Sequence, residues 1–205
     1  MPTFTDLDFV ADIELDDASV LVHRLGRPPV RLVLTSADPT TDAEITAAHD
    51  IHNDVKFVIS VPRDGRILGS AFNRCSELGL GIGHVGDAMR AIRDEDDPSK
   101  HVSREYAFVS RGLNQHSAIA KVVRLDDKRL RIERRSLPAL VAFIAPEYQP
   151  TADSVRNAVA RYDAFDVFVA TNPNSDPTPE AIAAGTAAGV GVLKWSPFLA
   201  YLHRA

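Results

Sequence analysis

The sequence predicts an α/β protein of two tandem homologous copies, each a β-hairpin followed by β-α-β-α-β-α with a mixed, mainly parallel sheet. Two observations lead to this prediction. Apolar segments typical of strands alternate with segments typical of helices, and the same order of segments occurs twice. Parallel strands joined by helices make right-handed crossovers, and each hairpin extends its sheet with antiparallel strands. We expect the two copies to pack as a pseudo-dimer.

The repeat is visible when residues 32–62 are set above residues 143–173, and residues 13–30 above residues 123–140. Identical residues at matched positions include Leu15 and Leu125, Pro28 and Pro138, Pro39 and Pro150, Thr40 and Thr151, and Phe57 and Phe168. This agreement indicates a tandem duplication. The first copy is expected at residues 1–95, a charged linker and helix at residues 96–111, and the second copy at residues 112–205.

Each copy begins with a hairpin signal, in which alternating apolar residues flank an Asp-Asp pair, at residues 11–25 and 120–134. Asp16-Asp17 and Asp126-Asp127 are therefore expected at turns. A strand that is apolar along most of its length follows at residues 30–36 and at residues 140–146.

Helix-start signals then mark the alternating part of each copy. Thr41 with Glu44 predicts a capping box, Thr151 is the expected cap in the second copy, and Thr178-Pro179-Glu180 opens a further helix. The buried parallel strands are expected at residues 56–61 and 166–171, and the short last strand with its closing helix at residues 78–92 and 190–202. One more helix is expected around residues 102–113.

The composition is that of an ordinary globular protein. The chain has 205 residues, 45% of them hydrophobic and 25% charged, so it can bury a core without metal or disulfide support. No apolar run approaches the roughly 20 residues of a membrane span, which predicts no contact with a membrane. A single cysteine, Cys75, fits a reducing cytoplasm. The sequence indicates no oligomeric state.

A cluster of basic residues interrupts an acidic chain of formal net charge −5. Residues 121–135 hold seven Lys and Arg residues, which are Lys121, Arg124, Lys128, Arg129, Arg131, Arg134 and Arg135. Such a patch on an exposed hairpin can bind phosphate groups of nucleic acid or an acidic protein partner. The alternative is a solvated surface without a partner.

Residues 49–54, HDIHND, place His49, Asp50, His52 and Asp54 within six positions. These residue types could bind a divalent metal, and no other cofactor is indicated. The alternative is the polar end of a helix, where histidine complements the helix dipole. Because the stretch precedes a strand, it is expected at the edge opposite to the one where ligands of parallel sheets collect.

Ligands of parallel sheets bind in the loops that follow the strands. In this chain those loops offer His84 in the first copy, and Asn172, Asn174 and Lys194 in the second. Residues 81–86 also match G-x-G-x-x-G, but they follow the last strand of a copy, so a tight strand-to-helix turn is the preferred interpretation.

The tail VFVATNPNSDPTPEAIAAGTAAGVGVLKWSPFLAYL (167–202) resembles the end of Mrr-like restriction endonuclease domains, and the order of elements in each copy resembles that fold. In this family an Asp followed by Glu-x-Lys or Gln-x-Lys on the central strands binds a metal and activates water. Here the corresponding strands, residues 30–35 and 140–145, lack that pattern, and Glu133 is a poor substitute. The resemblance implies a nuclease-like fold without nuclease activity.

Three functional hypotheses follow. The first is a non-catalytic interaction or regulatory module that binds nucleic acid or a protein through Lys128, Arg129, Arg131, Arg134 and Arg135. The second is an enzyme or a protein that binds a nucleotide or another phosphorylated ligand through the strand-end loops. The third is a metal-dependent hydrolase at residues 49–54.

Overall fold

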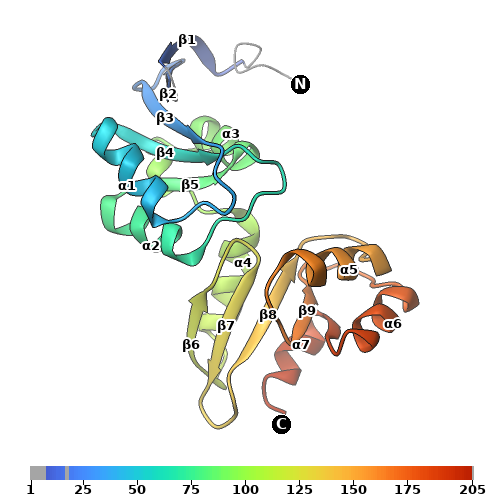
Figure 1. Cartoon of the computed structure of the whole chain (residues 1–205). Coiled ribbons are helices and arrows are strands. Elements are labelled where there is room, and N and C mark those ends of the chain that lie inside the picture. Colours follow the sequence, from blue (N-terminus) through green and yellow to red (C-terminus); the bar gives the residue numbers. More distant parts are fainter. Residues whose placement is uncertain (1–7, 17–18, 205) are drawn as a thin grey trace. The chain divides into compact units, whose positions relative to one another are not determined.

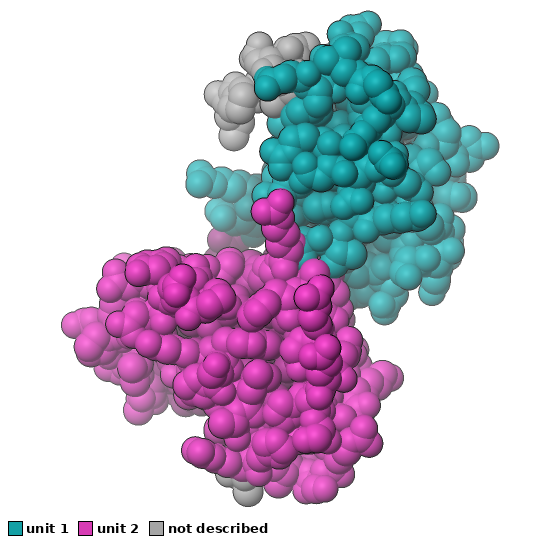
Figure 2. Space-filling view, turned by 180° about the vertical axis from the view of Figure 1, so that it is seen from behind, with its two compact units in different colours: residues 1–103 teal, residues 104–205 magenta. Residues whose placement is uncertain are grey.

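The computed structural model describes residues 8–16 and 19–204, and these fold as an α/β protein (Figure 1). The chain divides into two compact units, Met1–Ser103 and Arg104–Ala205, coloured separately in Figure 2. Each unit contains one five-stranded mixed sheet with helices on both faces. No helix of the described residues is both long and apolar enough to cross a membrane.

The first unit follows the predicted order of elements. Its strands are β1 (Val10–Asp16), β2 (Ser19–Arg24), β3 (Val30–Thr35), β4 (Val55–Ser60) and β5 (Gly81–His84). Its helices are α1 (Asp42–Ile51), α2 (Gly69–Leu78), α3 (Val85–Asp94) and the short η2 (Pro98–Lys100). The strands lie in the order β1-β2-β3-β4-β5, with β1, β2 and β3 antiparallel and β3, β4 and β5 parallel.

The second unit begins with the helix predicted around residues 102–113, which is α4 (Arg104–Asn114). Its strands are β6 (Ile119–Arg124), β7 (Arg129–Arg134), β8 (Leu140–Ala145), β9 (Val167–Ala170) and β10 (Gly191–Lys194). Its other helices are α5 (Ala152–Arg161), α6 (Pro179–Ala187) and α7 (Trp195–Tyr201). The sheet order is β10-β9-β8-β7-β6, again an antiparallel hairpin beside three parallel strands.

The helix-start signals form the predicted caps. The Thr41 hydroxyl accepts a hydrogen bond from the Ala43 backbone N–H, and Glu44 accepts one from the Thr41 backbone N–H over 2.7 Å. Thr151 caps α5 and Thr178 caps α6 in the same way. Such caps satisfy backbone donors that have no partner inside the helix. They fix where each helix starts after its strand.

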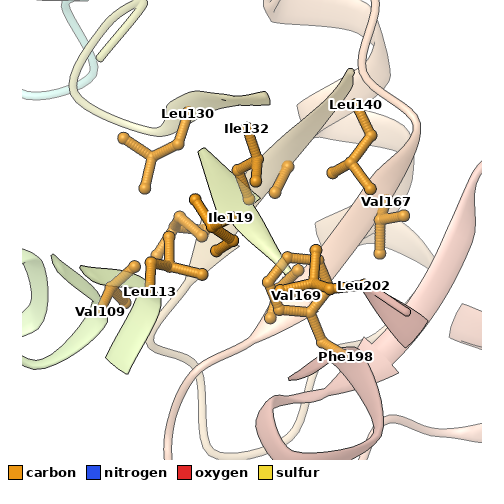
Figure 3. Packing of buried hydrophobic residues seen from close by; sticks show 12 residues of the cluster. Val109, Leu113, Ile119, Leu130, Ile132, Leu140, Val167, Val169, Phe198 and Leu202 are labelled. Carbon is orange, nitrogen blue, oxygen red and sulfur yellow. The ribbon is translucent and has the colours of Figure 1, made fainter. Parts of the chain in front are cut away.

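Each sheet separates two apolar cores. In the first unit α1 and α2 cover one face through Ile45, Ala48, Ala71 and Cys75, and α3 covers the other. Cys75 is a small buried residue of this core. In the second unit α5 and α6 cover one face of the sheet. Residues of α4 and α7, including Leu113 and Phe198, pack against Ile132 and Val169 on the other face (Figure 3).

The G-x-G-x-x-G segment comprises β5 and the first two residues of α3, so the chain passes directly from strand to helix within it. A Cβ at Gly81 would meet the Phe57 ring, and a Cβ at Gly83 would meet Asp87. Close packing therefore explains these two glycines. Of the two Asp-Asp pairs, Asp16 ends β1 and Asp126 lies in the turn after β6, whereas Asp17 lies outside the described residues.

Candidate functional site

Polar side chains from three elements meet at the carboxyl edge of the second sheet. Glu105 lies in the first turn of α4, Lys128 lies just before β7, and Thr171 directly follows β9. The Lys128 carbonyl accepts a hydrogen bond from the Ile144 N–H over 2.8 Å, and the Thr171 N–H donates to Ala145 over 2.8 Å. These backbone bonds hold both side chains beside the ends of β8 and β9, where ligands of parallel sheets bind.

The Glu105 carboxylate contacts both of the other side chains. The Lys128 ammonium lies 3.6 Å from the Glu105 carboxylate. The Thr171 hydroxyl lies 3.1 Å from both Glu105 and the Ala145 carbonyl oxygen, so it can donate to either. Thr171 is buried, while the Glu105 and Lys128 side chains are 25% and 31% exposed. The carboxylate and the ammonium are thus both within reach of a ligand from solvent.

Burial raises the pKa of the Glu105 carboxyl above its ordinary value, and the nearby Asp127 carboxylate adds to the increase. The Lys128 ammonium and the Thr171 hydroxyl act in the opposite direction without cancelling it. A carboxyl whose pKa is perturbed by burial together with a specific charge partner is a candidate functional group.

The turn before β7 is held by the buried Asp126. Its carboxylate accepts from the backbone N–H groups of Lys128 and Arg129 over 2.9 and 2.6 Å, and from Arg129 Nε over 2.8 Å. Arg129 also donates to the Asp163 carboxylate over 2.8 Å. Both oxygens of Asp126 therefore have partners within the turn, and neither is exposed.

Arg129 was predicted to lie on an exposed basic surface, and the structure corrects this. Its side chain is only 7% exposed, because Asp126, Asp163 and the Ala164 carbonyl surround the guanidinium. Tyr162 lies on the same side of the turn, with its hydroxyl donating to Asp127 over 3.4 Å. Burial, reinforced by the Asp127 and Asp126 carboxylates, raises the pKa of the Tyr162 phenol.

Other members of the basic cluster also have partners within the protein. Arg134 donates to the carbonyl oxygens of Pro138 and Arg204 over 2.7 and 2.8 Å, and Arg135 donates to Ser117 over 3.2 Å. Arg124 lies over the Tyr106 ring at 4.1 Å. Arg131 and Lys121 are exposed on β7 and β6, near Glu133. The structure does not bring the seven side chains together as one exposed surface.

The other strand-end residues lie beyond Thr171 along the same edge. The Asn172 side-chain oxygen accepts from the Asn174 N–H over 3.0 Å, which closes a turn within the loop. Lys194, the last residue of β10, lies 2.6 Å from the Asp176 carboxylate. The loop and β10 therefore present a second exposed ion pair at this edge, separated from Lys128 by the ends of β9 and β8.

His84 ends β5 in the first unit. Its Nδ1 lies 3.4 Å from the Ser60 carbonyl oxygen, and its backbone N–H donates to Asp87 over 3.3 Å. Asp87 also accepts from Arg90 over 2.7 Å and lies 3.9 Å from Nε2 of His101. His101 is a polar residue that the sequence did not single out. Its ring is buried, and neither nitrogen has a hydrogen-bond partner.

The HDIHND segment occupies the predicted place at the end of α1. His49 lies in its last turn, 3.8 Å from the Asp50 carboxylate, and His52 caps its carboxyl end. Asp54 accepts two bonds from Arg31 of β3. Within residues 8–16 and 19–204, no three His, Cys, Asp or Glu side chains are arranged to hold a metal ion. The four residues therefore do not form the metal-ligand cluster that was considered as an alternative.

Glu105 is not among the predicted site residues, because it falls in the predicted charged linker and helix at residues 96–111 and outside the strand-end loops. A signal for it was present. Glu105 precedes the buried Val109 and Leu113 by four and eight residues, so all three share one helix face. A carboxyl on the apolar face of a helix is a reason to look for a partner.

The chain was compared with protein-family models, with curated proteins and with solved structures, and no match was found in any of the three.

Proposed function

We propose that this protein is a non-catalytic interaction module, a duplicated restriction-endonuclease-like protein without nuclease activity. The observation that carries the proposal is the state of the carboxylates around the central strands. β3 and β8 contain no Asp or Glu, and the nearby Asp126 is buried with both oxygens bonded inside its own turn. A metal-dependent nuclease needs carboxylates that are free to bind the metal. The proposed function requires no cofactor.

The duplication is supported by equivalent hydrogen bonds in the two units. Arg24 Nε donates to the Pro28 carbonyl over 3.0 Å, and Arg134 Nε donates to the Pro138 carbonyl over 2.7 Å. The same two guanidinium groups also bond carbonyls just after equivalent helices, Glu95 after α3 in one unit and Arg204 after α7 in the other. We infer that the units are copies of one ancestral domain. The pseudo-dimer arrangement stays a prediction.

A protein partner fits the basic residues better than nucleic acid does. Binding to nucleic acid rests on Lys and Arg side chains that are free to contact several phosphates. Arg129 and Arg134 are instead bonded within their unit, and Lys128 is paired with Glu105. With a net charge of −5, the chain also lacks an overall field that would attract a polyanion. The single cysteine supports a reducing compartment such as the cytoplasm.

The second candidate function is binding of a small anionic ligand at the carboxyl edge of the second sheet. The partly exposed Lys128 beside a Glu105 carboxyl of raised pKa favours it, since protonation of Glu105 would free the ammonium to meet an anion. Inorganic phosphate is a suitable probe. Thermal stabilisation by millimolar phosphate that disappears in Lys128→Ala but persists in Lys121→Ala would support this site.

The main proposal is tested by fluorescence anisotropy with short single- and double-stranded DNA and RNA, at low and high salt and with Mg²⁺ or Mn²⁺. The same samples are then separated on a denaturing gel. We expect no salt-sensitive binding and intact strands. Binding that is lost in a Lys121→Glu/Arg131→Glu variant would replace the protein partner with nucleic acid, and cleavage would overturn the non-catalytic assignment.

A further inference from the structure

In the hairpin of the first unit, β1 and β2 extend the sheet, and on the side of the sheet that carries α1 and α2 the β1 residues are exposed. Paired residues on neighbouring strands point to the same face of a sheet. Ser19 pairs with Val33, which packs in the core beneath α1 and α2, so Ser19 and Leu21 of β2 point to that side. Their partners on β1 are Asp16 and Glu14, and Asp12 pairs with His23 two residues further along.

This surface, here called the acidic face, carries three exposed carboxylates around Leu21, those of Asp12, Glu14 and Asp16. Arg31 of β3 pairs with Leu21 on the other side, and its charge is paired with Asp54. The Glu14 carboxylate lies 2.7 Å from Nε2 of His23. Asp12 and Asp16 belong to the same strand, β1. β1 is the last strand of its sheet. The acidic face is thus a strip of negative charge at one border of the first unit.

The equivalent surface of the second unit has the opposite character. Arg129 pairs with Phe143, a core residue beneath α5 and α6, so Arg129 and Arg131 of β7 point to that side. Arg131 pairs with Val123 of β6, and Lys121 pairs with Glu133. Lys121 and Arg131 are exposed, while Arg129 is buried among its partners. This surface, the basic face, surrounds the half-buried Val123 and carries one carboxylate, that of Glu133, which lies 4.0 Å from Arg131.

The two units differ in net charge in the same sense. Residues 1–103 contain 10 Lys and Arg against 18 Asp and Glu, a formal charge of −8, and residues 104–205 contain 13 against 10, a charge of +3. Opposite charge on two surfaces steers them together and disfavours pairing of like surfaces. Each copy of the chain therefore carries an acidic face and a basic face of complementary charge.

We propose that the acidic face of one copy binds the basic face of a second copy, and that the second copy's acidic face binds the first copy's basic face. Leu21 and Val123 lie within these faces and supply apolar area, while the flanking charges set the pairing. Two such contacts related by a twofold axis close a dimer. The inference rests on the proposed function, because it names the protein partner of the interaction module as the chain itself.

The test is sedimentation velocity of the full chain, with charge-reversed variants. We expect a dimer at about 50 mM salt that dissociates toward monomer at about 500 mM, because salt screens exposed charges. Asp12→Lys/Glu14→Lys gives a chain with two basic faces, and Lys121→Glu/Arg131→Glu gives a chain with two acidic faces. Each variant alone should dimerise with a dissociation constant at least about tenfold weaker than that of the parent.

Mixing the two variants provides the decisive sample, since every contact between a chain of one kind and a chain of the other is again complementary. The mixture should form heterodimers at low salt. Matched controls with the same charge changes on exposed helical residues, Asp50→Lys/Glu77→Lys and Arg111→Glu/Arg156→Glu, should dimerise like the parent. Circular dichroism checks that each variant is folded.

A parent chain that remains monomeric at low salt overturns the inference, and so does a variant mixture that remains monomeric. Equal weakening by the helical controls would also overturn it, because net charge rather than the two faces would then control association. These outcomes are independent of the nucleic-acid assays. If the chain is monomeric and neither binds nor cleaves nucleic acid, only the self-association is ruled out. If the chain cleaves nucleic acid, the proposed non-catalytic function is ruled out.

Discussion

Asp126 and Arg129 form a buried ion pair in the turn that leads into β7, with Arg129 Nε donating to the Asp126 carboxylate over 2.8 Å. The pair closes a turn that sequence alone shows only as an Asp-Asp signal. It also explains why neither residue belongs to an exposed binding surface or to a metal site. The carboxylate is used to hold the backbone of the turn, and the guanidinium joins this turn to Asp163.

Removal of one partner should destabilise the second unit strongly. Asp126→Ala leaves the Arg129 charge buried with Asp163 as its remaining carboxylate and removes the acceptor for two backbone N–H groups. We expect the free energy of unfolding to fall by about 3–5 kcal/mol. Chemical denaturation measures it, and Arg111→Met, at an exposed position of α4, is the control, with a change within about 0.5 kcal/mol. A loss in Asp126→Ala no larger than in the control would show that the pair is not structural.

Glu105 should make stability depend on pH in a particular direction. Its pKa is higher in the folded than in the unfolded chain, so folding favours the protonated form, mainly because of burial. Its contribution to stability is therefore fully present below the ordinary value of 4.5 and is lost as pH rises through the folded-state pKa. Glu105→Gln removes this titration.

The measurement is the difference in unfolding free energy between Glu105→Gln and the parent, followed from acidic to neutral pH. Taking the difference cancels the contributions of the other titrating groups. We expect the variant to gain relative to the parent as pH rises. Glu180→Gln, exposed on α6, is the control for neutralising a carboxyl. A difference that stays constant with pH, or that falls, would show that the folded protein does not favour protonated Glu105.

His101 should be replaceable by an apolar residue with a gain in stability. Its ring is buried beside Phe57, at 6.4 Å between centroids, and both nitrogens lack hydrogen-bond partners. A buried polar group without a partner destabilises a fold by about 1–3 kcal/mol, and an apolar group of similar size removes that penalty. We expect His101→Leu to raise the melting temperature, with the exposed His203→Leu unchanged. A lower melting temperature for His101→Leu would mean that the imidazole has a favourable role, for which the nearby Asp87 would be the first partner to test.

The order of strands and helices could be predicted because its signals are local. Thr41 and Glu44 are three residues apart and form their cap within one turn, and the alternating residues of each hairpin reveal its two faces without knowledge of the rest of the chain. The parallel pairing of β3 with β4 followed from the intervening helix. Both sheets have the strand arrangement expected from these signals.

The candidate site could be predicted only in part, because its contacts join distant residues. Arg129 looks like a surface residue in its own stretch of sequence, and it is buried by Asp163, which lies 34 residues later. Glu105 meets Thr171 across 66 residues. The strand-end rule did select Asn172, Asn174 and Lys194 as residues of one edge, since that rule depends on topology rather than on particular contacts.

The most direct test of the central claim is a denaturing gel of DNA and RNA incubated with the full chain and Mg²⁺ or Mn²⁺. An Asp127→Asn variant is run beside the parent, because Asp127 is the partly exposed carboxylate of the turn, whereas Asp126 is buried. The account predicts intact strands with both proteins. Cleavage by the parent that is lost in Asp127→Asn would show an active metal-dependent nuclease and would contradict the account.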